Sequence, residues 1–487
     1  MLFSSATFIY LFLPLALFGF HLLQRRFGLT AAALWLTIAS VAFYGYWNIA
    51  DVPLLVGSTL VNFGIGLLLQ RRRGAAQLLL AAGVAGNLLL LGYYKYAAFF
   101  CGAVAEAGSC TGLPGDLPLA ISFFTFTQIA FLVDVHRGQV QDRDPLRYGL
   151  FVTFFPHLIA GPIVHYRDVG PQLADRAAFR ITSESLALGG SLFVAGLFKK
   201  VVLADRLASI ATPIFQAADA GTIISTATAW TGALAYTLQL YFDFSGYSDM
   251  AIGLALMFGI RFPANFHSPY KATSLIDFWR RWHITLSLFL RDYLYIPLGG
   301  NRHGPVRRYV NLLVTMLLGG LWHGANWTFL LWGLLHGIGL TVNHLWRGLA
   351  PAGWQGMQTR PAARAVAWLA TMTFAVVCWV SFRAGSLDAA GSLYAAMAGL
   401  SAGDPDAVPM EARHILLLVI AMLVCLLLPN TNQVFGIAVR GIRLQAPWPP
   451  LVFDYRLADF LVMAGMMLAS LYYLLINAPS EFLYFDF

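Results

Sequence analysis

Twelve apolar stretches dominate this sequence, and most of them are about as long as a membrane crossing. A helix needs about 20 mostly apolar residues to cross a hydrocarbon core of roughly 30 Å. The stretches lie near residues 3–23, 30–47, 53–70, 76–100, 117–136, 185–204, 223–242, 309–322, 326–346, 365–382, 414–428 and 458–476. No polar block between them is long enough for a separate soluble domain. We therefore expect an all-α polytopic membrane protein in which residues 1–487 form a single membrane domain.

The composition and the placement of charge also indicate a membrane protein. Hydrophobic residues make up 59% of the chain and charged residues 11%, against roughly 45–50% and 25% in soluble proteins. The net charge of +8 could suggest nucleic-acid binding. However, the basic residues lie in short loops between apolar stretches, which is the pattern that orients membrane helices. We expect contact with membrane lipid and none with nucleic acid.

The loop charges predict how the chain is oriented. Arg25 and Arg26 follow the first apolar stretch, whereas a signal peptide carries its positive charge ahead of its apolar core. This stretch is therefore expected to be a retained span with its N-terminus outside. The basic loops expected inside contain Arg71–Arg73, Arg137–Arg147, Arg360, Arg364, Arg440, Arg443 and Arg456. The acidic loops expected outside contain Asp51, Glu106, Asp116, residues 384–411, Glu481 and Asp486. Both termini are then periplasmic in a bacterial inner membrane.

The middle of the chain departs from this alternation. Residues 148–166 are apolar but contain Pro156 and the Gly161–Pro162 pair, which predicts a re-entrant or broken helix. On a helical wheel of about 100° per residue, most polar residues of the segment 275–296 lie on one arc. This pattern predicts an amphipathic helix in the plane of the cytoplasmic interface. We expect N-terminal spans in 1–136, a core in 137–347 and C-terminal spans in 348–487.

The four cysteines divide into two pairs. Cys101 and Cys110 flank a short loop expected outside, where a disulfide could form, and the sequence leaves open whether it does. Cys378 and Cys425 lie within apolar stretches and are expected to be core residues. No spacing of Cys and His resembles a zinc site, so we expect no metal.

His323 is the ionisable residue that most needs an explanation. It lies within the apolar stretch 310–340, with Gly319–Gly320 before it and Gly324 after it. A polar group at that depth needs a partner or a cavity, and the glycines leave room for one. Imidazole titrates near pH 6.5, so a neutral ring can take a proton from an alcohol and return it to a leaving group. The alternative is a helix-packing histidine bonded to a neighbouring carbonyl.

His283 and two carboxylates are further candidates. His283 lies at the edge of the polar arc, where it could reach the interface as a structural residue or form a polar wall of a cytoplasmic site. Asp243, Tyr247 and Asp249 lie directly after an apolar stretch. A carboxylate at the bilayer centre costs about 2.5–3.5 kcal/mol, so this run could either cap a helix break or line a wet substrate cavity.

A basic group follows in the sequence. It could hold the phosphates of a cofactor or an acidic carrier protein, or it could attract anionic lipid headgroups. Its members are Arg280, Arg281, Arg291, Arg302, Arg307 and Arg308.

Four motifs in order make the chain resemble the membrane-bound O-acyltransferase (MBOAT) superfamily, and most closely its alginate O-acetylase branch. The motifs are YFDFSGYSDM at 241–250, FWRRWH at 278–283, RDYLYIPLGGN at 291–301 and GGLWHGANW at 319–327. The opening MLFSS and the closing FLYF at 482–485 are similar to this branch as well, so the resemblance covers nearly the whole chain.

The resemblance implies a fold, a reaction and site residues. The fold would be a ring of about 11–12 transmembrane helices, with re-entrant and in-plane helices, around a central tunnel. His323 would match the essential buried histidine and act as the general base, and His283 would match a second polar position on the cytoplasmic side. Trp322 and Asn326 could steady the oxyanion.

The resemblance further implies the substrates. An acetyl thioester, acetyl-CoA or another acyl donor, would enter from the cytoplasm with its phosphates near Arg280 and Arg281. No cofactor would be bound permanently. The acetyl group would pass to a hydroxyl of an envelope or exopolysaccharide, alginate first, with periplasmic acetyltransferase proteins as partners. An acetyl-histidine intermediate stays open.

Three other functions compete with this interpretation. Within acyl transfer they are a teichoic acid D-alanyltransferase and a peptidoglycan O-acetyltransferase. From another class, a transporter of polysaccharide or of lipid-linked sugar would also have broken helices and polar groups inside the membrane. A transporter would show repeated halves, and the sequence has no such repeat.

Overall fold

The chain folds into two compact units of helices. The computed structural model describes residues 1–104, 110, 112–114, 116–350, 360–401, 403, 408, 411–439, 442–443, 452–477 and 482–483. One unit comprises Met1–Leu197, Tyr247–Pro263 and Tyr455–Asp486, and the other comprises Phe198–Gly246, Ala264–Asp454 and Phe487. The single membrane domain with three consecutive parts, and the ring and tunnel, remain predictions.

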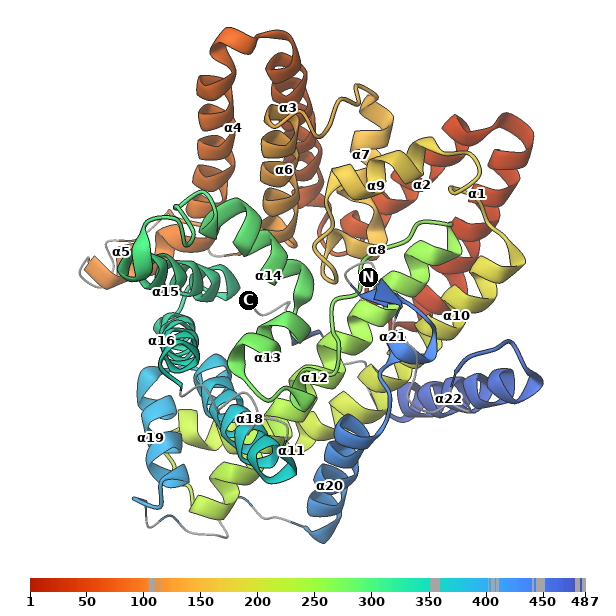
Figure 1. Cartoon of the computed structure of the whole chain (residues 1–487). Helices are drawn as coiled ribbons and strands as arrows, with labels where there is room; N and C mark the ends of the chain where they lie inside the picture. The colour runs from red at the N-terminus through yellow and green to blue at the C-terminus, as the bar shows by residue number, and fades with distance from the viewer. Residues whose placement is uncertain are drawn as a thin grey trace. The chain divides into compact units, whose positions relative to one another are not determined.

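The first unit contains the N-terminal helices and the last helix of the chain (Figure 1). Its elements are η1 (Phe8–Phe12), α1 (Leu13–Phe27), α2 (Leu29–Gly45), η2 (Ile49–Asp51), α3 (Val52–Arg71), η3 (Arg73–Ala75), α4 (Ala76–Leu91), η4 (Gly92–Tyr96), α5 (Ala97–Val104), α6 (Ile121–His136), α7 (Pro145–Thr153), α8 (Phe155–Leu158), α9 (Tyr166–Ala174), α10 (Ser183–Phe198) and α22 (Leu457–Ile476). In Figure 1, α3, α4 and α6 lie side by side and pack on one another.

The second unit contains three of the motifs that carry the family resemblance, at 278–283, 291–301 and 319–327. Its elements are η5 (Lys199–Ala204), α11 (Asp205–Asp219), η6 (Pro269–Lys271), α13 (Leu275–Arg281), α14 (Ile284–Leu290), η7 (Arg291–Tyr295), α15 (Gly304–His323), α16 (Trp327–Leu349), α18 (Pro361–Arg383), α19 (Leu387–Met397), α20 (Ala412–Leu427), α21 (Thr431–Val434), β1 (Ala438–Val439) and β2 (Ile442–Arg443). The helix α12 (Thr226–Met257) crosses from this unit into the first one after Gly246.

Each of the twelve predicted apolar stretches is helical, which confirms an all-α polytopic membrane protein. Six helical segments among the described residues are long and apolar enough to cross a membrane. They are Phe8–Phe27, Ile49–Arg71, Ala76–Ala103, Ser183–Asp219, Pro361–Arg383 and Leu457–Ile476. Shorter apolar helices cover Leu29–Gly45, Ile121–His136 and Ala412–Leu427. The orientation from loop charges stays a prediction, and six charges used for it lie outside the described residues, namely Glu106, Asp404, Asp406, Arg440, Glu481 and Asp486.

Residues 148–166 form the predicted broken helix. α7 ends at Thr153, α8 begins at Phe155 as a single turn, and extended backbone leads on to α9. Asp144 starts α7 by accepting hydrogen bonds from the backbone N–H groups of Leu146 and Arg147, with proline at the first helical position. Every residue from 148 to 166 is buried except Gly149, and the capping residue Asp144 lies in the loop before this range. Protein therefore surrounds this irregular backbone, as is required at membrane depth.

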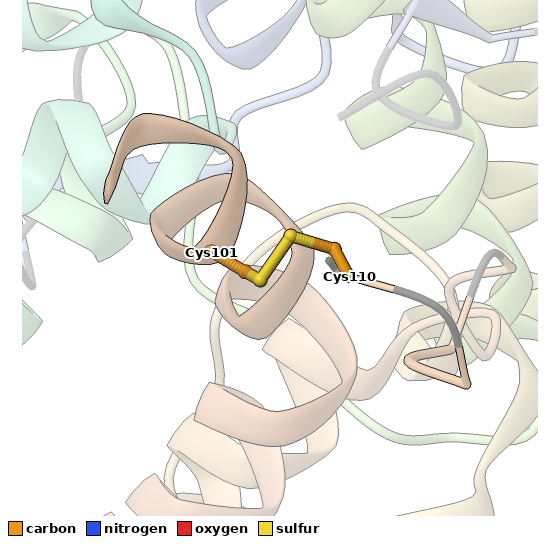
Figure 2. Close-up of a disulfide and its surroundings, with 2 residues drawn as sticks. All are labelled: Cys101 and Cys110. Atoms are coloured by element: carbon orange, nitrogen blue, oxygen red, sulfur yellow. A yellow bond between two sulfur atoms is a disulfide. The ribbon is translucent and has the colours of Figure 1, made fainter. Parts of the chain in front are cut away.

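The Cys101 to Cys110 disulfide is present (Figure 2). It closes the loop after α5, with 6.0 Å between the two Cα atoms. Cys378 and Cys425 are free and buried, as expected. We expect Cys101 and Cys110 to react with an alkylating reagent only after reduction, and Cys378 and Cys425 only after denaturation. Mass spectrometry of the alkylated protein measures this order. Labelling of Cys101 without a reductant would contradict the disulfide.

Candidate active site

The hairpin of α15 and α16 positions His323, because the two helices pack closely along their length (Figure 1). Glycines make this approach feasible. A Cβ atom on Gly333 would lie 2.5 Å from the carbonyl oxygen of Met316, and one on Gly320 would collide with the carbonyl oxygen of Phe329. The space expected beside His323 is therefore filled by the partner helix and, at Gly324, by the ring of Phe329.

His323 is the last residue of α15 and only 3% exposed. Its ring contacts three aromatic side chains. The centroid of the ring lies 5.0 Å from that of Trp322, 5.1 Å from that of Trp332 and 5.1 Å from that of Phe382. Trp332 and Phe382 both meet the imidazole edge to face. The histidine thus ends a helix inside an aromatic shell, which the sequence did not predict.

The predicted helix over 275–296 is wrong as a continuous element. It breaks between α13 and α14, where His283 has a positive φ of 39°. The cause is Asn265, 18 residues earlier, because its backbone carbonyl accepts from the N–H of Ile284 and its side-chain Oδ1 from the N–H of Thr285. These bonds satisfy backbone donors that a new helix exposes at its start.

His283 is fully buried, so the alternative of a side chain that reaches the interface is wrong. Its Nδ1 lies 3.1 Å from Oδ1 of Asn265, which also accepts from the N–H of Thr285. A side-chain amide oxygen can only accept, so Nδ1 of His283 carries the proton and Nε2 keeps its lone pair. Burial lowers the pKa of His283 to about 3, so the ring is neutral at physiological pH. Trp322 lies near both candidate histidines, with its ring centroid 6.4 Å from that of His283.

His336 belongs to the same cluster, and the sequence offered no mechanism for it. The indole N–H of Trp279 donates to its Nδ1 at 3.2 Å, which leaves the ring proton on Nε2. Trp332 connects the two histidines, because its ring centroid lies 4.8 Å from that of His336 and 5.1 Å from that of His323. The signal that could have found it is its place on α16 one helical turn after Trp332, whose ring contacts His323 of α15.

 

Asn326 positions the loop after His323. Its Oδ1 accepts from the backbone N–H of Thr328 at 3.1 Å and so caps α16. Its Nδ2 donates to the carbonyl oxygen of Gly385 at 3.0 Å. Oδ1 of Asp219 accepts from the N–H of the same Gly385 at 2.9 Å. These bonds tie the motif to the segment before α19.

A cavity of about 670 Å³ lies beside these hydrogen bonds of Asn326, Gly385 and Asp219. Asp219 and Ser386 line it, and hydroxyl and carboxylate groups recur around its wall. The polar members of the lining are Asp219, Thr222, Ser386, Asp388, Ser392 and Ser401. A cavity whose wall combines these polar groups with apolar residues such as Ile223 and Leu400 thus lies beside the segment that Asn326 holds.

Asp243 lies inside a continuous helix, so its alternative role as the cap of a helix break is wrong. α12 runs through the whole motif without interruption. The carboxylate of Asp243 is buried and pairs with the ammonium group of Lys200 at 2.5 Å, and Lys200 also pairs with Asp205 at 3.0 Å. Burial alone would make this carboxylate costly, and the ion pair with Lys200 offsets that cost, so a charged residue is tolerated in so apolar a segment.

Tyr247 and Asp249 lie on the part of α12 that belongs to the first unit. Both are buried. The ring of Tyr247 stacks on Phe3 at 4.8 Å and on Phe482 at 4.4 Å between centroids. The opening and closing segments singled out in the sequence therefore meet on this tyrosine.

Arg280 and Arg281 differ in their surroundings. Arg281 donates to Oδ1 of Asp277 at 2.9 Å and to the carbonyl oxygen of His267. Arg280 is exposed, and no ion pair of Arg280 is found among the described residues. Among those residues no group of three or more His, Cys, Asp or Glu side chains could hold a metal ion.

The sequence is similar over most of its length to known acyltransferases. Residues 115–380 match the model of the membrane-bound O-acyltransferase family. The chain belongs to this family. It is 44% identical over 431 residues to a peptidoglycan O-acetyltransferase of Helicobacter pylori, covering 82% of this chain and 80% of that one. It is 40% identical over 509 residues to a protein named as a probable alginate O-acetylase in Pseudomonas putida, covering 100% of both.

Membership of the MBOAT family makes this protein an O-acyltransferase and decides against the transporter alternative. A teichoic acid D-alanyltransferase of Streptococcus thermophilus is also similar, but at 29% identity over 238 residues, which cover 47% of this chain and 57% of that one. His323, His283 and His336 all lie within the matched range 115–380. The buried histidine cluster is therefore part of the MBOAT core of the chain.

Proposed function

We propose that this MBOAT enzyme moves an acetyl group from a cytoplasmic thioester, acetyl-CoA, across the inner membrane to a hydroxyl of an envelope or exopolysaccharide. Alginate is the first candidate acceptor. The observation that carries the proposal is His323, a buried imidazole at the end of α15, in a chain that aligns with an O-acetylase over its full length. His323 acts as the general base.

The chemistry requires one base and balances without a cofactor. His323 takes the proton of the acceptor hydroxyl as the oxygen attacks the thioester carbonyl. The new C–O bond forms, the C–S bond breaks, and the proton passes from His323 to the departing CoA sulfur. Neutral His283, with the lone pair of Nε2, is a further polar group on the donor side, and indole N–H groups such as that of Trp322 can stabilise the oxyanion.

The proposed sides of the reaction follow from the predicted topology. The loop charges put the segment 384–411 outside, and the disulfide-bearing loop after α5 is also expected outside, where oxidising conditions favour such a bond. The cavity beside Gly385 borders that outer segment. We assign the cavity to the approach of the hydroxyl acceptor, alone or presented by a periplasmic acetyltransferase partner. The donor then reaches His323 from the other end of α15.

The O-acetyl content of the envelope glycans tests which acceptor the enzyme uses. We expect mass spectrometry of the envelope glycans of the source organism to show O-acetyl groups on alginate that disappear when the gene is deleted and return with the intact protein. Deletion that removes O-acetyl groups from peptidoglycan and leaves the exopolysaccharides unchanged would assign the acceptor of the Helicobacter pylori relative instead. Loss of D-alanyl esters with all O-acetyl groups retained would contradict acetyl transfer.

A further inference from the structure

Three arginines surround His344 at the end of the α15 and α16 hairpin opposite His323. Nη2 of Arg308, on α15, donates to Nδ1 of His344 at 2.6 Å. The charges of Arg347, on α16, and Arg280, on α13, also act on the His344 ring. Nη2 of Arg347 is held by Oγ of Ser274 at 3.3 Å. Arg308 of α15 and Arg347 of α16 thus lie at the same end of the hairpin as His344, and Arg280 of α13 is close enough for its charge to act there.

These three positive charges lack a counter-ion within the part of the chain that the structure describes. The carboxylate closest to Arg280 in the sequence has another partner, because Asp277 pairs with Arg281 at 2.9 Å. Residues 351–359, which follow α16, contain no Asp or Glu in the sequence. Like charges held together repel one another. An anion that binds between them would remove that repulsion.

We propose that Arg280, Arg308 and Arg347 bind a phosphate group of the acetyl donor. The inference rests on the proposed function and names the place where the donor is recognised. A guanidinium fork matches the oxygens of a phosphate with two parallel hydrogen bonds. Arg281, expected beside Arg280 in this role, is instead occupied by Asp277.

The length of α15 favours a phosphate of CoA over one of a lipid headgroup. Arg308 and His323 are separated by 15 residues of one helix, which corresponds to about 22 Å at 1.5 Å per residue. An extended pantetheine arm has a length of the same order. A donor with its phosphate at Arg308 can therefore present its thioester at His323. A lipid headgroup shares the phosphate chemistry but carries no group that the reaction needs at His323.

The test compares two donors that differ in phosphate. Purified enzyme in discs of neutral lipid is given acetyl-CoA or acetyl-pantetheine, which has the same thioester arm and no phosphate. We expect wild type to have a KM for acetyl-CoA at least tenfold lower than for acetyl-pantetheine. Arg308→Gln and Arg347→Gln should each raise the KM for acetyl-CoA about tenfold and leave that for acetyl-pantetheine unchanged. Arg364→Gln, an exposed arginine at the start of α18, is the matched control.

The outcomes separate the phosphate site from the proposed function. Equal KM values of wild type for the two donors would overturn the site even if no variant folds, and would leave acetyl transfer standing. If neither donor is turned over by wild type, the proposed function itself fails. Repeating the comparison in discs of anionic lipid tests the lipid source. An effect of Arg308→Gln that appears only there, with no change in the KM for acetyl-CoA in neutral discs, would assign the arginines to lipid headgroups and overturn the proposal.

Discussion

Replacing His323 with glutamine is expected to lower kcat for acetyl transfer by about 10²–10⁴-fold, the usual contribution of a positioned general base. Glutamine keeps a polar side chain of similar length among Trp322, Trp332 and Phe382, but it cannot accept a proton at neutral pH. The rate of CoA release from acetyl-CoA in the presence of an acceptor measures the effect. The shell of three aromatic rings should hold either side chain, so the fold is expected to survive.

A matched control keeps this result interpretable. His136→Gln makes the same chemical change at an exposed position at the end of α6, and it should leave kcat unchanged. Size-exclusion chromatography and circular dichroism compare the folded state of both variants with wild type. A well-folded His323→Gln enzyme that retains a tenth or more of the wild-type kcat would show that His323 is a packing histidine.

Breaking the buried pair of Lys200 and Asp243 is expected to destabilise the protein by about 3–5 kcal/mol in Lys200→Met, which leaves the carboxylate of Asp243 buried without this partner. Asp243 is 1% exposed and the side chain of Lys200 is 6% exposed. Asp243→Asn should cost less, because Lys200 keeps its ion pair with Asp205 at 3.0 Å. The double variant removes both charges and should regain most of the lost stability. The midpoint of thermal unfolding in detergent, read for all three variants, gives the comparison.

Asp205→Asn supplies the control for this pair. Asp205 also contacts Lys200, but its side chain is 25% exposed, so water can replace part of the interaction and a smaller loss is expected. Single variants as stable as wild type would contradict a structural role. A double variant no more stable than the single ones would show that Asp243 does more than balance Lys200.

The sequence predicted the helices well because hydropathy is a local property. Each apolar stretch carries its own signal, and so does the break near Pro156. The break at His283 was missed because the residue that causes it, Asn265, is supplied by a different segment of chain. A helical wheel drawn on 275–296 contains no information about that segment. The broken helix is therefore a tertiary effect.

The candidate site was predicted in part for the same reason. His323 was found from its depth in an apolar stretch and from its motif. The partners that define the other groups are distant in sequence, and no local pattern points to them. Lys200 lies 43 residues before Asp243, and Trp279 lies 57 residues before His336. Arg308 and Arg347 meet at His344 only because α15 and α16 pack as a hairpin.

The most direct test of the account is acetyl transfer across a sealed membrane. Vesicles containing the purified enzyme are given acetyl-CoA labelled in the acetyl group on the cytoplasmic side and a hydroxyl acceptor on the other side. We predict labelled ester on the acceptor, free CoA left on the side of addition, and neither product with His323→Gln. Labelled ester formed equally well by the His323→Gln enzyme, or CoA recovered on the acceptor side, would contradict transmembrane acetyl transfer by this histidine.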